Sequence, residues 1–190
     1  LVGSEMCIRD SMYTGTYRIA GRSISIESQY PDVHAYCAAY RYAGEPDFTI
    51  RITPADIDRE RDKSAREDQR QGIAPRAFPE GYLEELAVYR QIADRMPAYD
   101  TLLIHGSAIA LDGAAYLFTA RSGTGKSTHT RFWRQTFGSR AVMINDDKPL
   151  VGLTDAGAVI YGTPYNGKHR LGENLSAPLQ AICILERGAE

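Results

Sequence analysis

ARSGTGKST, at residues 120–128, has the spacing of a phosphate-binding loop. Ala120 stands at the first position of that pattern, Gly125 and Lys126 at the sixth and seventh, and Ser127 at the eighth. From average residue frequencies, this loose pattern arises by chance in about one chain of this length in a hundred. The neighbouring segments must therefore distinguish a nucleotide site from a glycine-rich turn.

The residues on both sides of the loop indicate an α/β unit. A strand is predicted before the loop at residues 114–119, a helix after it to Phe137, and an apolar strand at residues 141–144. That last strand leads into Asn-Asp-Asp at residues 145–147. A strand, loop, helix, strand and acid pair in this order form the setting that a phosphate loop requires.

Two further strands are predicted upstream, at residues 102–104 and 107–111. Asp112-Gly113 follows the second of them and is a strong hairpin signal. The phosphate loop is therefore expected to follow the second strand of an antiparallel hairpin.

Each residue type in the loop suits phosphate binding. Gly123 and Gly125 allow backbone conformations that bring N–H groups to phosphate oxygens, and the following helix adds the positive end of its dipole. Lys126 can neutralise the terminal phosphates, and Ser127 can offer its hydroxyl to a magnesium ion that bridges them. The sequence therefore predicts binding of a nucleotide together with magnesium.

Asp146 and Asp147 follow Lys126 by twenty and twenty-one residues. At the carboxyl end of a strand, a parallel arrangement would set them beside the phosphate loop, where magnesium needs a carboxylate. Because side chains alternate along a strand, one carboxylate is expected to serve the metal and the other to reach a nucleophile. The alternative is a polar turn at residues 145–147 with local hydrogen bonds.

His105-Gly106, the hairpin, the phosphate loop and the acid pair together resemble the catalytic domain of HPr kinase/phosphorylase, the bacterial serine kinase of a sugar-transport phosphocarrier. The SGTGKST segment also resembles phosphoenolpyruvate carboxykinase, which shares with that family a core in which an antiparallel hairpin leads into the phosphate loop. The resemblance covers residues 101–190 and is strongest to the uncharacterised HPr serine kinase-like branch. It implies an α/β fold, with an HPr kinase/carboxykinase-like P-loop domain preceded by a small α+β domain.

The resemblance also implies roles for the matching positions. The phosphates of ATP would be cradled by Ser122, Gly123, Thr124, Gly125, Lys126, Ser127 and Thr128. Magnesium would be held by Ser127 and Asp146, and Asp147 would be the base toward an acceptor hydroxyl, with His105 beside it. The reverse order of the two aspartates is the alternative.

A second loop, at residues 162–170, lies between two apolar runs and carries the consecutive bases Lys168, His169 and Arg170. Lys168 is the candidate for stabilising the transferring phosphoryl group or binding an anionic acceptor. The alternative is a solvated loop whose charges have no partner.

The N-terminal half reads as a small α+β region. Period-two alternation predicts strands around Ile24 and Ile26 and over residues 47–52. Thr53, Pro54 and Asp56 resemble a capping box that starts a solvated helix to about Arg70. A second helix is predicted over residues 79–96, and its core stripe is expected to be Tyr82, Leu86, Tyr89, Ala93 and Met96.

The two ends of the chain carry their own expectations. Residues 1–11, LVGSEMCIRDS, resemble a translated sequencing adapter, and we expect them to be an artefact that precedes the initiator Met12. We expect the small domain to span residues 12–99 and the P-loop domain residues 100–190, with the natural chain continuing beyond Glu190.

Composition narrows the function classes. With 43% hydrophobic and 24% charged residues in a chain of 190, disordered and fibrous classes are poor fits. The net charge of −2 gives no field for nucleic acid or an anionic membrane, and no apolar run is long enough to span a bilayer. Cys37 and Cys183 lie far apart in apolar surroundings, which favours reduced thiols in a cytoplasmic protein.

These features lead to one main hypothesis and two alternatives. The chain is expected to be an ATP- and magnesium-dependent phosphotransferase that acts on a hydroxyl of a protein, peptide or small molecule. A non-catalytic nucleotide-sensing module is one alternative. A carboxykinase-like or phosphorylase-like reaction is the other.

Overall fold

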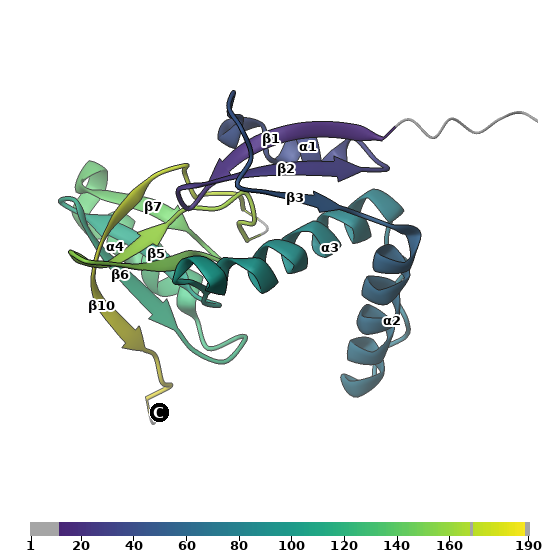
Figure 1. The fold of residues 1–190 in the computed structure, drawn as a ribbon. Coiled ribbons are helices and arrows are strands. Elements are labelled where there is room, and N and C mark those ends of the chain that lie inside the picture. Colours follow the sequence, from purple (N-terminus) through teal and green to yellow (C-terminus); the bar gives the residue numbers. More distant parts are fainter. Residues whose placement is uncertain (1–11, 168, 189–190) are drawn as a thin grey trace, which may run out of the picture.

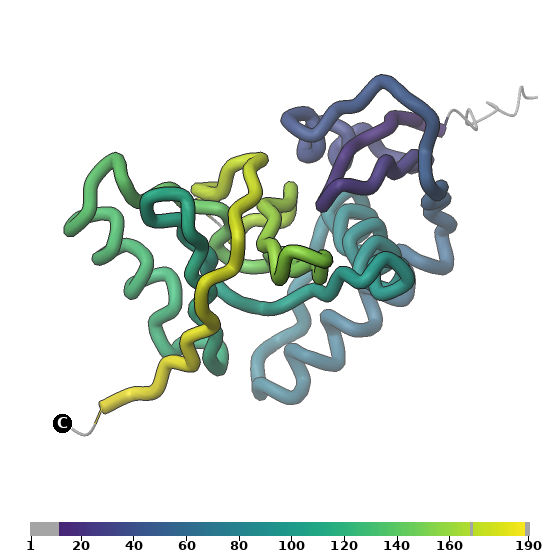
Figure 2. The backbone as a smooth tube through the Cα atoms, turned by 60° about the vertical axis from the view of Figure 1, so that its left-hand side comes forward, coloured from purple at the N-terminus to yellow at the C-terminus, as the bar shows by residue number. Residues whose placement is uncertain are grey.

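The computed structural model describes residues 12–167 and 169–188, and this part of the chain is mixed α/β with two sheets and four α-helices (Figure 1). Within these residues, no helix is both long and apolar enough to cross a membrane. Figure 2 shows the N-terminal sheet with its helices on one side of the molecule and the larger sheet with α4 on the other.

The N-terminal sheet contains three strands in the order β1 (Tyr13–Ile19), β2 (Arg22–Ser28) and β3 (Phe48–Arg51). β1 and β2 are antiparallel, whereas β2 and β3 are parallel. Ile24, Ile26 and Ile50 are fully buried, so the alternation predicted for these strands is confirmed. Between β2 and β3, α1 (Asp32–Tyr36) and the 3₁₀ turn η1 (Ala38–Tyr40) complete this core.

α2 (Pro54–Arg70) begins at the predicted capping box. The Asp56 carboxylate accepts hydrogen bonds from both the backbone N–H and the hydroxyl of Thr53. Ion pairs with spacing i,i+3 decorate the helix, as at Arg59 with Asp56. Glu60, however, is buried and pairs with Arg90 of the next helix, so α2 is less solvated than its composition predicts.

α3 (Glu80–Arg95) corrects the predicted stripe in part. Met96 is fully buried and Tyr89 packs against the core as predicted, whereas Leu86 and Ala93 are only partly buried. Its buried positions are Gly81, Leu83, Glu84, Ala87, Val88 and Ile92. Tyr82, which was expected in the core, is 43% exposed. Glu84 is among the buried positions, and its carboxylate accepts backbone hydrogen bonds from Gln29 and Tyr30. The 3₁₀ turn η2 (Met96–Tyr99) then leads to the second sheet.

The second sheet has seven strands in the order β4-β8-β9-β10-β6-β5-β7. Their bounds are β4 (Thr101–Leu103), β5 (Ser107–Leu111), β6 (Ala114–Thr119), β7 (Ala141–Asn145), β8 (Leu150–Thr154), β9 (Gly157–Tyr161) and β10 (Ser176–Ile184). α4 (Lys126–Phe137) covers one face of β5, β6 and β7 with Trp133 and Phe137, and the 3₁₀ turn η3 (Gly138–Arg140) returns the chain to β7.

The strand directions bring three chain segments to one edge of this sheet. β5 is antiparallel to both β6 and β7, so β6 and β7 run parallel with β5 between them. The predicted hairpin of β5 and β6 is therefore confirmed. β10 is parallel to β6 on its other side. The carboxyl ends of β6, β7 and β10 meet at the same edge, where the phosphate loop and the acid pair lie.

The two halves of the chain share a core. Leu150 of β8 and Tyr165, which follows β9, are buried in the cluster that contains Ile24, Ile50 and Val88 of the N-terminal half. The Tyr165 ring also contacts the rings of Tyr36 and Tyr89, at 5.7 and 4.5 Å between centroids. The loop after β9 is therefore supported from the N-terminal sheet side.

Candidate functional site

The phosphate loop connects β6 to α4 through a backbone that depends on its glycines. Gly123 has a φ of +77° and Gly125 a φ of +113°, the left-handed region that side chains disfavour. A Cβ at either position would meet no atom within 4 Å, so the requirement is conformational and not steric. The twelve-residue α4 starts at Lys126 and directs the positive end of its dipole at the loop.

Lys126 lies over this loop. The residue is only 9% exposed, and its Nζ donates to the backbone oxygen of Ala120 at 3.1 Å. A weaker contact of 3.5 Å joins the same amine to the Arg121 oxygen. The loop backbone therefore holds one positive charge at its centre.

Asp146 is fixed by a chain of buried hydroxyls. Its Oδ1 accepts a hydrogen bond of 2.7 Å from the hydroxyl of Ser107, at the start of β5. Thr130 Oγ1 of α4 lies 2.9 Å from that Ser107 hydroxyl and 3.3 Å from the backbone oxygen of Ser127. The carboxylate at the end of β7 is thus tied to the helix of the phosphate loop, one turn after Lys126.

Ser107 and Thr130 were not expected at the site from the sequence. Both are polar side chains almost without solvent exposure, at 0% and 1%. Ser107 is a polar residue at the start of an apolar strand, and Thr130 is a hydroxyl residue four positions after Lys126. Both patterns are also common where a residue has no role in a functional site.

Asp147 points to other partners. Its Oδ1 lies 3.3 Å from Nε2 of His105, and its Oδ2 lies 3.2 Å from Nζ of Lys148. Asn145 makes the turn that was considered as the alternative for residues 145–147, because its side-chain oxygen accepts from the backbone N–H of Asp147 and Lys148. The polar turn does not exclude the other alternative, because the two carboxylates that follow Asn145 still have different partners.

A cavity of about 480 Å³, here named the phosphate cavity, brings most of the expected site residues together. It is lined by His105, Ser122, Gly123, Gly125, Lys126, Ser127, Thr128, Asp146, Asp147, Gly167 and His169. Thr124 is half-buried in the loop but does not line it. Lys168 lies outside the described residues.

His169 and Arg170 lie in two different places. His169 lines the phosphate cavity, whereas the Arg170 guanidinium lies 4.4 Å from the centre of the Tyr36 ring, toward the N-terminal half. Gly167 itself passes close to the acid pair, since a Cβ there would lie 3.5 Å from Oδ2 of Asp146.

Arg187 is a third residue at the site that the sequence did not indicate. It follows β10, and its Nη2 donates to the Gly123 oxygen at 2.9 Å. The parallel pairing of β10 with β6 carries this arginine to the phosphate loop. No local pattern in the sequence could reveal a contact that spans 64 residues.

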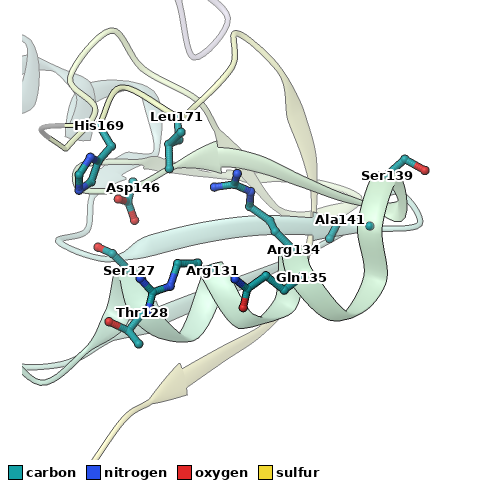
Figure 3. Close-up of a pocket in the computed structure, with 11 residues that line it drawn as sticks. Ser127, Thr128, Arg131, Arg134, Gln135, Ser139, Ala141, Asp146, His169 and Leu171 are labelled. Carbon is teal, nitrogen blue, oxygen red and sulfur yellow. The ribbon is translucent and has the colours of Figure 1, made fainter.

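A neighbouring cavity of about 800 Å³, here named the arginine groove, runs along α4 (Figure 3). It shares Ser127, Thr128, Asp146 and His169 with the phosphate cavity. Its other lining residues are Arg131, Arg134, Gln135, Gly138, Ser139, Ala141 and Leu171. The two cavities together form one continuous surface around Asp146 and Ser127.

Ser127 and Asp146 fit a magnesium ion that is bound together with a nucleotide and has only a few protein ligands. In the described part of the chain, no three His, Cys, Asp or Glu side chains are grouped to hold a metal ion. Ser127 and Asp146 nevertheless line the same cavity beside the phosphate loop. One hydroxyl and one carboxylate, with phosphate oxygens and water completing the shell, are a donor set that magnesium accepts.

Comparison with other proteins adds no assignment to this site. The chain matches no protein-family model in a scan of such models, and a search of the curated proteins finds no match.

Proposed function

We propose that this protein is an ATP- and magnesium-dependent phosphotransferase acting on a hydroxyl of a protein, peptide or small molecule. One observation carries the proposal: Lys126, Ser127, Asp146 and Asp147 line a single cavity at the edge of the sheet. These four supply the cation, the metal ligands and the base that phosphoryl transfer needs.

The proposed fold is a P-loop domain of the HPr kinase and carboxykinase type. Two features support this assignment. The phosphate loop follows an antiparallel hairpin, β5 and β6, and the strand that bears the acid pair is separated from β6 by β5. The resemblance of His105-Gly106, SGTGKST and the acid pair to HPr kinase/phosphorylase points the same way.

The residues would divide the work between binding and proton transfer. Backbone N–H groups from Gly123 to Ser127 and the Lys126 ammonium would hold the phosphates. Bound magnesium would neutralise phosphate charge, with Ser127 and Asp146 as its protein ligands. Asp147 would take the proton of the acceptor hydroxyl, and His105, 3.3 Å away, would orient that carboxylate.

A nucleotide-sensing module is the second candidate, and a specific contact favours it. Lys148 Nζ lies 3.2 Å from Asp147 Oδ2, so an ion pair occupies the carboxylate that would have to accept the proton. In a sensing module Asp147 would keep this pair and no transfer would follow. A carboxykinase-like or phosphorylase-like reaction would use the same phosphate geometry in another direction.

Calorimetric titration with ATP and magnesium tests the proposal. The unaltered protein is expected to bind, and Lys126→Ala to bind about tenfold or more weakly, because a charged hydrogen-bond donor is lost. Lys63→Ala, which alters an exposed lysine on α2, is the matched control and should bind normally. Absence of binding by the unaltered protein contradicts the phosphate-loop assignment.

Transfer itself separates the two candidates. The protein is incubated with ATP, magnesium and fractions of a cell extract, and products are identified by mass spectrometry. A phosphorylated product that depends on Lys126 supports the phosphotransferase. Nucleotide binding with no product in any fraction supports the sensing module.

A further inference from the structure

The arginine groove has room for a second ligand beside a bound triphosphate. Its volume is about 800 Å³, against about 480 Å³ for the phosphate cavity that it adjoins. Asp146 and Ser127 belong to both, so a ligand in the groove would reach the phosphate cavity at the proposed metal site. Figure 3 shows the groove between α4 and the segment that carries His169 and Leu171.

The charges in this groove are mostly positive. Arg131 and Arg134 are three residues apart on α4 and so are neighbours on the helix surface. Neither forms an ion pair with a carboxylate among the described residues, whereas Arg140, just beyond the helix, is bonded to Asp112. Among the described residues that line the groove, Asp146 at its phosphate end is the one acid. Guanidinium groups that have no carboxylate partner favour binding of an anion.

The side chains of Arg131 and Arg134 lie along the groove that leads to the phosphate cavity. In Figure 3 the Arg131 side chain lies toward Ser127 and Thr128, and the Arg134 side chain rises from α4 toward Leu171. Arg134 is half-buried, which makes its charge less screened than that of an exposed residue. The groove thus presents two planar donors along the path to the phosphate cavity.

The lining is less suited to a nucleobase. Within residues 12–167 and 169–188, no Phe, Tyr or Trp on which a base could stack lines the groove, and its apolar side chains are Ala141 and Leu171. Arginine, glutamine, serine and threonine provide hydrogen-bond donors in their place. These donors match a carboxylate or a phosphate group better than an apolar ring.

We propose that the arginine groove binds the phosphoryl acceptor through an anionic group, so that the acceptor is a hydroxyl compound bearing a carboxylate or a phosphate. This inference rests on the proposed phosphotransferase function and specifies its substrate class. Arg131 and Arg134 hold the anionic group, and the hydroxyl end of the acceptor enters the phosphate cavity past Asp146.

The transfer step then balances without a further reactant. The acceptor oxygen forms a bond to the γ-phosphorus of ATP, and the bond from that phosphorus to the β,γ-bridging oxygen breaks. ADP leaves with the electron pair of the broken bond. The hydroxyl proton passes to the Asp147 carboxylate and from there to water.

Calorimetry with 3-phosphoglycerate as the probe tests the groove, because this molecule carries a hydroxyl, a carboxylate and a phosphate. It is titrated into the full chain with and without magnesium and a non-hydrolysable ATP analogue. The unaltered protein is expected to bind the probe but not glycerol. The double variant Arg131→Gln/Arg134→Gln should bind the probe at least about tenfold more weakly and the ATP analogue within about twofold of normal.

Arg140→Gln is the matched control, because Arg140 is exposed, lies just after the same helix and does not line the groove. It should bind the probe as the unaltered protein does.

Equal probe binding by the double variant, or no probe binding by the unaltered protein, overturns the proposal. Weaker binding of the ATP analogue by the double variant also overturns it, since the groove would then hold the nucleoside. Failure of the ATP analogue to bind the unaltered protein contradicts the proposed function instead, and the titration without nucleotide still tests the groove.

Discussion

Asp146 and Asp147 are adjacent in the chain but have different surroundings. Asp146 is 7% exposed and receives the Ser107 hydroxyl, while Asp147 is more exposed and faces His105 and Lys148. The Asp146 carboxylate is therefore held by a buried hydroxyl, which suits the proposed metal ligand, and the Asp147 carboxylate is more accessible, which suits the proposed base. The two side chains are expected to respond differently to the same substitution.

Asp146→Asn should raise the magnesium concentration needed for nucleotide binding. Asp147→Asn should retain ATP affinity and lose transfer by roughly 10²- to 10⁴-fold, the range of a general base. Binding titrated against magnesium and single-turnover transfer are measured for both variants. Exchanged phenotypes would reverse the assignment of the two aspartates, and full transfer by both would favour the sensing module.

Among the elements, α3 carries a buried acid on its inner face. Ile92 is 2% exposed against the N-terminal sheet, whereas Tyr82, on the stripe expected from periodicity, is 43% exposed. The Glu84 carboxylate, bonded to the backbone N–H of Gln29 and Tyr30, occupies the inner face. Burial raises the pKa of Glu84, and those two hydrogen bonds oppose the rise.

Ile92→Ala is expected to lower the free energy of unfolding by about 2–5 kcal/mol, because it leaves a cavity in the core. Tyr82→Ala should lower it by less than about 1 kcal/mol, as for most exposed positions. Urea denaturation of both variants gives the comparison. Similar costs at the two positions would mean that α3 does not bury the face described above.

Features that depend on residues close together in the sequence could be predicted, whereas contacts between residues far apart in the chain could not. The capping box at Thr53 and the hairpin at Asp112-Gly113 depend on neighbouring residues, and both were predicted. In α3, Tyr82 was placed wrongly in the core and the burial of Glu84 was missed, because Glu84 bonds to Gln29 and Tyr30, which lie 55 and 54 positions away in the chain. The Ser107 and Arg187 contacts were missed for the same reason, since the strand order that creates them has no local sequence signal.

At the scale of the whole molecule, stability should depend on pH through His34. Its ring bonds to the hydroxyls of Tyr17 and Ser28, at 2.7 and 2.9 Å, and so connects α1 to β1 and β2. Desolvation by burial is the main cause that lowers the pKa of His34 below its usual value. In acid the unfolded chain therefore binds a proton that the folded chain resists.

The free energy of unfolding should consequently fall as the pH drops through the ordinary histidine pKa, about 6.5, and this contribution should level off below the lowered pKa of the folded state. His34→Gln removes the titrating group, so its stability should change less between pH 7 and pH 5. Urea denaturation at a series of pH values measures both proteins. An equal change in the two would exclude His34 as the source.

The shared core has a consequence for how the molecule can be divided. Leu150 and Tyr165 belong to the half with the phosphate loop, yet they are buried among side chains of the N-terminal sheet. A fragment cut before β4 would expose both to water and release the segment that leads to Gly167 and His169. Splitting the gene between the two halves would therefore separate the edge that carries the predicted phosphate loop from the sheet that supports it.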